Sequence, residues 1–179
     1  MIVEESQIQA LITRACKGDE ECFGQIYELF SDRVFNFLIH KVKHKETAED
    51  LLHNIFLKAW KSLPNYKPQS NAKFSTWLFS IAQHTVIDHW RVNREVVDLD
   101  KVENLAQLAI EPQWFEDYSF LVRALDQLPD DYQTVINLRF KQDLSVTETA
   151  QVMNRSEVGI RVLQHRAIKA LKKLLDGKL

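Results

Sequence analysis

The chain of 179 residues contains few residues of the kinds that break helices or crosslink a fold. It has four Gly, four Pro and two Cys. So little Gly and Pro argues against a turn-rich all-β protein and favours long helices. Cys16 and Cys22 are too few for a disulfide framework, and no Cys-His cluster has zinc spacing. We therefore expect two reduced thiols, no metal site and no cofactor.

Long apolar runs are also missing. No stretch approaches the roughly 18 apolar residues that a membrane-spanning helix needs. The acidic N-terminus, MIVEESQIQ, lacks the apolar run of a signal peptide. With 45% hydrophobic and 27% charged residues, the composition is typical of a soluble globular protein, and we expect a cytoplasmic one.

The formal net charge of −2 hides two segments of opposite charge. Residues 95–131 contain ten acidic and two basic side chains, a net charge of −8. Residues 155–173 contain six basic side chains and one acidic, a net charge of +5. Such segregation indicates different roles for the two segments.

Hydrophobic periodicity predicts an all-α fold with two small helical domains joined by an acidic linker. In the first domain, over about residues 5–93, four stretches repeat apolar residues with helical spacing and can share one core. Asp19 is expected to cap the second helix, and Thr47 with Asp50 to open the third in the style of a capping box. Residues 94–113 are interpreted as the linker, with an acidic helix packed into either domain as the alternative.

The second domain is predicted over residues 114–177. Asp130 or Asp131 is expected to cap one of its helices. The sequence Ser145-Val-Thr-Glu148 is a full capping box and opens a short helix. A tight turn at Asn154-Arg155 then leads to a long final helix that Ser156 can cap. Two short helices, a turn and a longer basic helix are typical of a helix-turn-helix.

The final helix is the clearest candidate for a binding surface. Basic residues recur at helical spacing opposite its leucines: Arg161, His165, Lys169 and Lys172. Such a stripe suits the major groove of DNA, where Lys and Arg neutralise phosphates and Arg can bind a guanine edge. A basic helix that is only solvated, or that binds an acidic partner, is the alternative.

Two further segments combine polar and apolar side chains. Residues 66–91 mix aromatic rings with basic and polar groups, as a site for single-stranded nucleic acid requires. Most of these rings are equally well explained as core, with Tyr66 in the predicted loop as the main exception. The helix over residues 48–60 can be half core and half partner surface. No Gly-rich phosphate loop and no His-Glu-x-x-His spacing is present, so we expect no enzyme.

Three stretches carry a resemblance to a known family. They are AEDLLHNIFLKAW at 48–60, FSTWLFSIAQHTVIDHWR at 74–91 and LPDDYQTVINLRFKQDLSVTETAQVMNRSEVGIRVLQHRAIKAL at 128–171. In this order they resemble the sigma factors of bacterial RNA polymerase, of the short, two-domain, extracytoplasmic-function (ECF, group four) type. The resemblance implies a factor that binds core polymerase, directs it to specific promoters and helps to melt the minus-ten element.

The resemblance also nominates residues. The family's first segment binds the clamp helices of the largest polymerase subunit, which nominates Asp50, Leu51, Asn54 and Phe56. The following loop and helix capture a flipped base of the minus-ten element, which nominates Tyr66, Lys67, Ser70, Asn71, Lys73 and His84. The final helix enters the major groove at the minus-thirty-five element, which nominates Ser156, Arg161, Val162, His165 and Arg166.

The resemblance implies further partners, and this chain departs from the family in three places. The flap of the second-largest polymerase subunit is an expected partner, an anti-sigma factor is a candidate, and the linker is expected in the RNA exit path. The family often has Gln where His53 stands and Asn where His84 stands. The recognition helix departs from the family, which usually reads Gly-Thr-Val-Lys-Ser-Arg where this chain has Val158-Gly-Ile-Arg-Val-Leu163. The minus-thirty-five sequence is therefore not carried over from relatives.

Two other functions are compatible with the residues alone. A self-contained helix-turn-helix regulator with an N-terminal sensor domain would bind duplex DNA specifically without polymerase. An anti-sigma factor or adaptor would bind proteins only, which the basic stripe of the final helix argues against.

Overall fold

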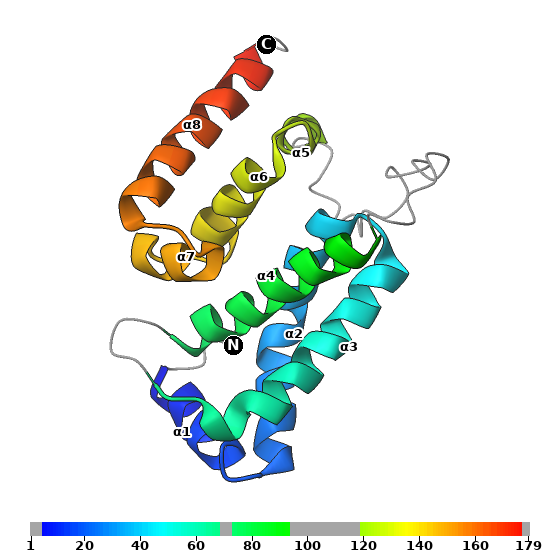
Figure 1. The fold of residues 1–179 in the computed structure, drawn as a ribbon, viewed down its shortest axis with the longest axis vertical. Coiled ribbons are helices and arrows are strands. Elements are labelled where there is room, and N and C mark those ends of the chain that lie inside the picture. Colours follow the sequence, from blue (N-terminus) through cyan, green and yellow to red (C-terminus); the bar gives the residue numbers. More distant parts are fainter. Residues whose placement is uncertain (1–4, 69–72, 94–118, 177–179) are drawn as a thin grey trace. The chain divides into compact units, whose positions relative to one another are not determined.

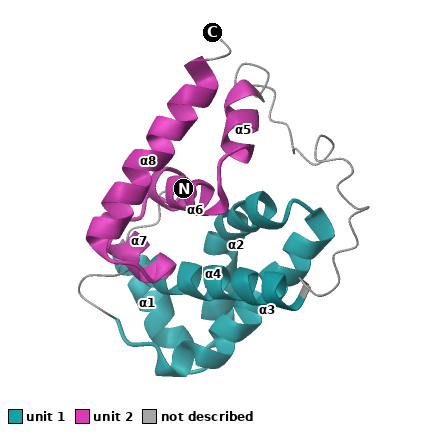
Figure 2. Cartoon of the chain, turned by 45° about the horizontal axis from the view of Figure 1, so that its top comes forward, with its two compact units in different colours: residues 1–103 teal, residues 104–179 magenta. Residues whose placement is uncertain are grey.

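The computed structural model describes residues 5–68, 73–93 and 119–176, and it contains helices and no strand over those ranges (Figure 1). This confirms the all-α prediction. The chain divides into two compact units, residues 1–103 and 104–179 (Figure 2). The predicted linker and its helical alternative lie outside the described residues, as does the start of the second domain at residue 114. The domain bounds of 5–93, 94–113 and 114–177 therefore stay a prediction.

Over its described residues, the first unit contains four α-helices and one short 3₁₀ helix. They are α1 (Glu5–Ala15), α2 (Glu20–Val42), α3 (Lys45–Ser62), η1 (Leu63–Asn65) and α4 (Phe74–Asn93). Helix α2 contacts α1, α3 and α4, and α3 and α4 lie side by side (Figure 1). The largest fully buried side chains of this core come from all four helices and η1: Ile12, Ile26, Val34, Phe37, Leu38, Ile55, Leu63, Leu78 and Phe79.

Two helix starts in this unit were predicted, and one of them was wrong. Asp19 caps α2 as expected, because its carboxylate accepts from the backbone N–H of Cys22 at 3.0 Å. The third helix, however, begins at Lys45, with His44 and not Thr47 as its N-cap. The His44 ring accepts through Nδ1 from the backbone N–H of Thr47 at 3.3 Å. Lys43 adopts the left-handed conformation (φ 55°) and ends α2 directly before His44. Helix α3 therefore starts earlier than the Thr47 hydroxyl suggested.

We expect His44→Asp to stabilise the first unit. A short Asp side chain is a preferred N-cap, whereas an imidazole is not, so the free energy of unfolding should rise by about 0.5–1 kcal/mol. Urea unfolding of the full chain measures the change. His53→Asp is a matched control, because His53 is exposed within the same helix and an internal Asp gains no cap. Equal stability changes in the two variants would contradict the capping role of His44.

The second unit is built from α5 (Ser119–Asp126), α6 (Asp130–Ile136), a π-helical turn η4 (Asn137–Lys141), α7 (Val146–Met153) and α8 (Glu157–Asp176). Helix α8 contacts α5, α6 and α7. Buried residues of α6, α7 and α8 form the centre of this core: Val135, Ala150, Ile160 and Ala167. Partly buried side chains pack around them: Tyr132, Ile136, Val146, Met153 and Leu163.

The capping box of the second unit is confirmed. The Ser145 hydroxyl accepts from the Glu148 backbone N–H at 3.1 Å, and the Glu148 carboxylate accepts from the Ser145 backbone N–H at 2.8 Å. The cap by Asp130 or Asp131 is wrong, because Pro129 precedes α6 without a side-chain cap. The carbonyl of Pro129 already accepts from the N–H groups of Tyr132 and Gln133. Both aspartates lie in the first turn, where negative charge stabilises the positive end of the helix dipole.

Candidate nucleic-acid interface

The turn between α7 and α8 sets the direction of the last helix. Asn154 adopts the left-handed conformation (φ 50°, ψ 51°), and the N–H of Arg155 reaches back to the Ala150 carbonyl at 3.0 Å. Asn tolerates this conformation better than most residues. The hydroxyl of Ser156 then accepts from the N–H of Gly159 at 3.1 Å, so the predicted cap of the final helix is confirmed. Together α7, the turn and α8 form the expected helix-turn-helix.

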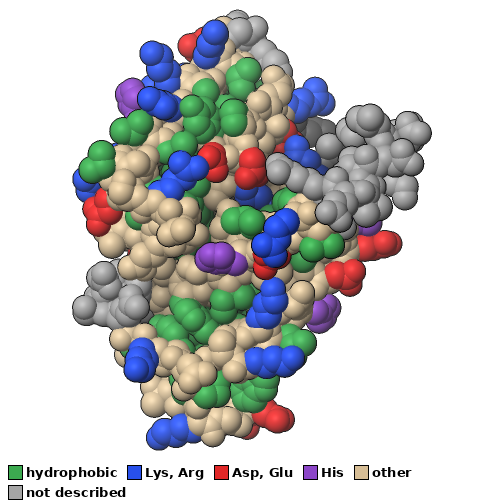
Figure 3. Space-filling view, in the orientation of Figure 1, with side chains coloured by type: hydrophobic (Ala, Val, Ile, Leu, Met, Phe, Trp, Pro, Cys, Tyr) green, Lys and Arg blue, Asp and Glu red, His purple; other side chains and the backbone are tan. Residues whose placement is uncertain are grey.

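Helix α8 has one buried and one exposed face. Ile160 and Ala167 are buried in the core. The exposed residues include the nominated Arg161, Val162, His165 and Arg166, followed by Lys169, Lys172 and Lys173. Along α8, the space-filling view shows basic and His side chains beside hydrophobic ones (Figure 3). The structure therefore brings the nominated residues of this helix together on its solvent face, and Ser156, also exposed, lies just before the helix begins.

Polar contacts hold the N-terminal half of α8 to its neighbours. Thr147 of α7 donates to the Glu157 carboxylate at 2.8 Å, and Arg161 lies 3.5 Å from the same carboxylate. Arg139 of η4 donates from Nε to the Gln164 side chain at 3.1 Å and from Nη1 to the Leu144 carbonyl.

A further ion pair fixes the turn. The guanidinium of Arg155 is 2.5 Å from the carboxylate of Asp131 in α6. The sequence analysis missed all of these partners. Only Glu157, four residues before Arg161, follows a spacing that indicates a helical ion pair.

The aromatic segment of the first unit forms a cluster. Tyr66 packs against Phe74 and Trp77 with ring centroids 5.5 and 4.9 Å apart, and Phe74 and Trp77 are 5.2 Å apart. Phe74 is buried, whereas Tyr66 and Trp77 are partly exposed. Tyr66 is therefore neither a free loop ring nor a full core residue. The nominated Lys67 and Lys73 are exposed, and Ser70 and Asn71 lie outside the described residues.

His84 lies two turns after Trp77 on α4. A separation of seven residues places both side chains on the same face, about 10 Å apart along the axis. His84 is exposed, and its Nδ1 is 2.7 Å from the Ser80 carbonyl. A carbonyl only accepts, so Nδ1 carries a proton in this contact, and Nε2 is the ring nitrogen that faces solvent.

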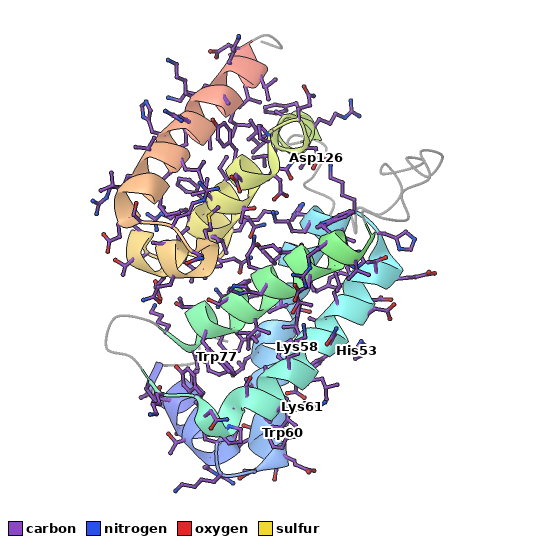
Figure 4. The ribbon with its side chains drawn as sticks, in the orientation of Figure 1. His53, Lys58, Trp60, Lys61, Trp77 and Asp126 are labelled. Carbon is purple, nitrogen blue, oxygen red and sulfur yellow. The ribbon has the colours of Figure 1, made fainter. Side chains whose placement is uncertain are left out.

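The nominated residues of α3 divide between surface and core. Asp50 and Asn54 are exposed, whereas Leu51 and Phe56 are buried, with exposed fractions of 6% and 4%. The exposed face also carries residues that the sequence analysis did not nominate: His53, Leu57, Lys58 and Lys61. His53, Lys58 and Lys61 are labelled on this helix in Figure 4. Lys58 reaches across to α4, where Nζ donates to the Thr85 hydroxyl at 3.1 Å.

Two family models match this chain, one in each of its two helical units. Residues 26–96 match the Sigma-70 region 2 family and residues 124–173 match Sigma-70, region 4. The chain is 34% identical to the ECF RNA polymerase sigma factor BldN of Streptomyces coelicolor, over 96% of this chain and 67% of that protein. It is 32% identical to the ECF sigma factor SigX of Bacillus subtilis, over 88% and 85% of the two chains. The chain belongs to the ECF sigma factors of RNA polymerase.

A solved structure supports the same assignment. The sigma factor RpoE of Bartonella quintana, in complex with the anti-sigma factor NepR, has a TM-score of 0.71 and 27% identity. The alignment covers 86% of this chain and 96% of that one. This sigma factor therefore directs RNA polymerase to promoters, and the alternative of a self-contained regulator is not favoured. The region 2 match contains α3 and α4, and the region 4 match contains the helix-turn-helix.

Both cysteines of the sigma factor lie in the described residues of the first unit. Burial raises the pKa of the Cys16 and Cys22 thiols, which disfavours the nucleophilic thiolate. Within residues 5–68, 73–93 and 119–176, no three His, Cys, Asp or Glu side chains are grouped so that they could hold a metal ion. None of the helices over those ranges has both the length and the apolar character needed to cross a membrane.

Proposed function

We propose that this sigma factor binds promoter DNA through two surfaces and core polymerase through a third. At the minus-thirty-five element, α8 lies in the major groove and presents Arg161, Val162, His165 and Arg166, while Ser156 lies at the helix start. The single observation that carries this assignment is the exposed basic face of α8 behind a capped helix-turn-helix. Phosphate contacts of Lys169, Lys172 and Lys173 position the helix, and Arg161 reads a base edge.

At the minus-ten element, a flipped base binds between the aromatic cluster and the exposed side of α4. Unstacking a base costs on the order of a few kcal/mol, which a stacking and hydrogen-bonding pocket offsets. Tyr66 and Trp77 supply partly exposed rings, Lys67 and Lys73 face the backbone phosphates, and His84 offers its exposed Nε2 for a hydrogen bond. Ser70 and Asn71 belong to this proposed site from the family resemblance alone.

Core polymerase binds the exposed face of α3. Asp50 and Asn54 contact the clamp helices of the largest subunit. Leu51 and Phe56 act from the core, where they hold α3 against the rest of the unit and so orient that face. The second unit contacts the flap of the second-largest subunit, and the acidic linker lies in the cationic RNA exit path.

Three broader properties complete the proposal. The factor performs no covalent chemistry, since promoter melting needs binding energy and no catalytic residue. It acts in the cytoplasm with the polymerase. An anti-sigma factor regulates it, as the structure of the Bartonella quintana relative with NepR suggests by analogy.

Run-off transcription tests the proposed function. Core polymerase is assayed with and without the full chain on a library of duplex promoters. We expect transcripts with defined start sites only when the chain is present. If the chain adds no defined start site, the proposed function is wrong.

We expect Leu57→Ala and Asn54→Ala to weaken binding to core polymerase. Leu57 has 52% of its surface exposed in the middle of the proposed polymerase face, so a bound clamp helix would bury its side chain. Truncation at the centre of such an interface costs about 1–2 kcal/mol, or roughly 5- to 30-fold in Kd. Fluorescence anisotropy with labelled sigma factor measures the affinity. Glu28→Ala on the exposed side of α2 is the control, and an equal loss there would argue against a specific role of α3.

We also expect the free chain to bind duplex promoter DNA weakly. The segment 95–131 has a net charge of −8 and competes with DNA for the basic face of α8. A gel shift at physiological salt should show little specific complex until core polymerase is added. Tight, specific binding without polymerase would contradict this prediction and would favour the self-contained regulator.

A further inference from the structure

Two valines stand at the centre of the exposed face of α8. Val158 has 68% and Val162 has 45% of its surface exposed. They are four residues apart, so they lie one above the other on the helix. His165 and Lys169 continue the same line toward the C-terminal end. Neither valine contributes to the buried core that Ile160 and Ala167 form on the opposite side.

Helix stability does not explain these valines. A β-branched side chain on an exposed helix position has a lower helix propensity than Ala, Lys or Glu. An exposed apolar patch with polar residues around it is typical of a binding surface. Arg161 lies between the valines in sequence and Arg166 one turn after Val162, while Glu157 beside Val158 is paired with Arg161, so the surface suits a polyanion with an apolar group inside its groove.

The major groove of B-DNA offers one apolar group on its base edges, the C5-methyl group of thymine. We propose that Val158 and Val162 contact thymine methyl groups in the minus-thirty-five element of this sigma factor. Four residues of helix rise about 6 Å, and base pairs stack about 3.4 Å apart, so the two methyl groups should lie about two base pairs apart, on either strand. Arg161, between them, reads a neighbouring guanine. This inference rests on the proposed placement of α8 in the groove and names what that face recognises.

The experiment has two stages and uses holoenzyme made from core polymerase and the full chain. First, the holoenzyme selects promoters from a pool that is randomised over the minus-thirty-five region, and the selected promoters are sequenced. We expect thymines at two fixed positions. Second, each thymine is replaced by deoxyuridine, which removes the methyl group and keeps every hydrogen-bonding atom. Loss of one methyl contact should lower promoter affinity about three- to fivefold, the change expected from exposing one methyl-sized group.

Variants connect each methyl group to its valine. Val158→Ala and Val162→Ala should weaken the unsubstituted promoter by a similar factor, and each should abolish the effect of deoxyuridine at one position only. Alanine is a better helix former than valine, so a weaker helix cannot cause the loss. Val162→Ile is the matched control, because it keeps an apolar surface and should keep the sensitivity to deoxyuridine.

The outcomes separate this inference from the proposed function. Wild-type holoenzyme that initiates at selected promoters but ignores deoxyuridine would overturn the thymine contact while the sigma function stands. The same holds if both alanine variants keep the full deoxyuridine effect. If no upstream sequence is selected at all, the placement of α8 in the groove fails, and the valine contact fails with it.

Discussion

The variant Phe79→Ala should unfold most of the first unit and abolish initiation. Phe79 is fully buried and packs edge-on against the fully buried Phe37, with ring centroids 5.6 Å apart. The guanidinium of Arg33 lies 5.7 Å from the Phe79 ring centroid and 5.7 Å from that of Phe30. Truncating a buried Phe to Ala costs about 3–5 kcal/mol, which approaches the whole stability of a small domain.

Two spectroscopic signals distinguish local from global unfolding in this variant. Trp60, Trp77 and Trp90 lie in the first unit, so tryptophan fluorescence follows mainly that unit, whereas circular dichroism follows the helices of both. The fluorescence transition should move to much lower temperature while part of the helical signal keeps its wild-type transition. Ile87→Ala on the same helix is the control, because Ile87 is 51% exposed and should change stability by no more than about 0.5 kcal/mol. A similar shift in both variants would contradict a core role for Phe79.

The helices of this protein could be predicted because their apolar residues repeat at helical spacing. The Ser145–Glu148 box and the Asp19 cap were also predicted, since each depends on residues within one turn of the chain. The start of α3 was not, because it depends on the left-handed Lys43 and on an imidazole acting as the cap. Cap rules expect Gly or Asn at a left-handed helix end and Ser, Thr, Asp or Asn at an N-cap, so neither Lys43 nor His44 signals its role in the sequence. The start of α6 failed for a similar reason, since the Pro129 carbonyl supplies the acceptor that an Asp side chain was expected to supply.

Which residues of the candidate sites are exposed could be predicted from the sequence only in part. Helix α3 carries apolar residues on several sides, so spacing alone does not decide that Leu51 and Phe56 are buried while Leu57 is exposed. That choice depends on where α2 and α4 pack against α3. On α8, by contrast, the buried positions leave a single open face, so the basic stripe could be predicted from the sequence. The contacts of Arg139 and Thr147 with α8 could not, because they join residues 25 and 10 positions apart in the chain.

The variant Arg161→Ala should relax minus-thirty-five selectivity and cost about 1–3 kcal/mol of promoter affinity. Arg161 is exposed on α8, and its guanidinium pairs with Glu157 at 3.5 Å. Thr147 donates to the same carboxylate at 2.8 Å, so Glu157 lies beside the guanidinium on α8. The planar guanidinium can form two hydrogen bonds to one guanine, which alanine cannot replace.

Promoter competition with the holoenzyme measures this effect, with selected and scrambled minus-thirty-five elements in the same reaction. Arg161→Ala should bring the two promoters close to equal use, whereas Lys172→Ala should weaken both by the same factor, since a phosphate contact carries no sequence information. Arg161→Lys should keep affinity for phosphate but lose the two-bond geometry, and therefore part of the selectivity. If Arg161→Ala keeps the wild-type preference while Lys172→Ala behaves as expected, then α8 reads its promoter element through other side chains, and Arg161 is only one of its phosphate contacts.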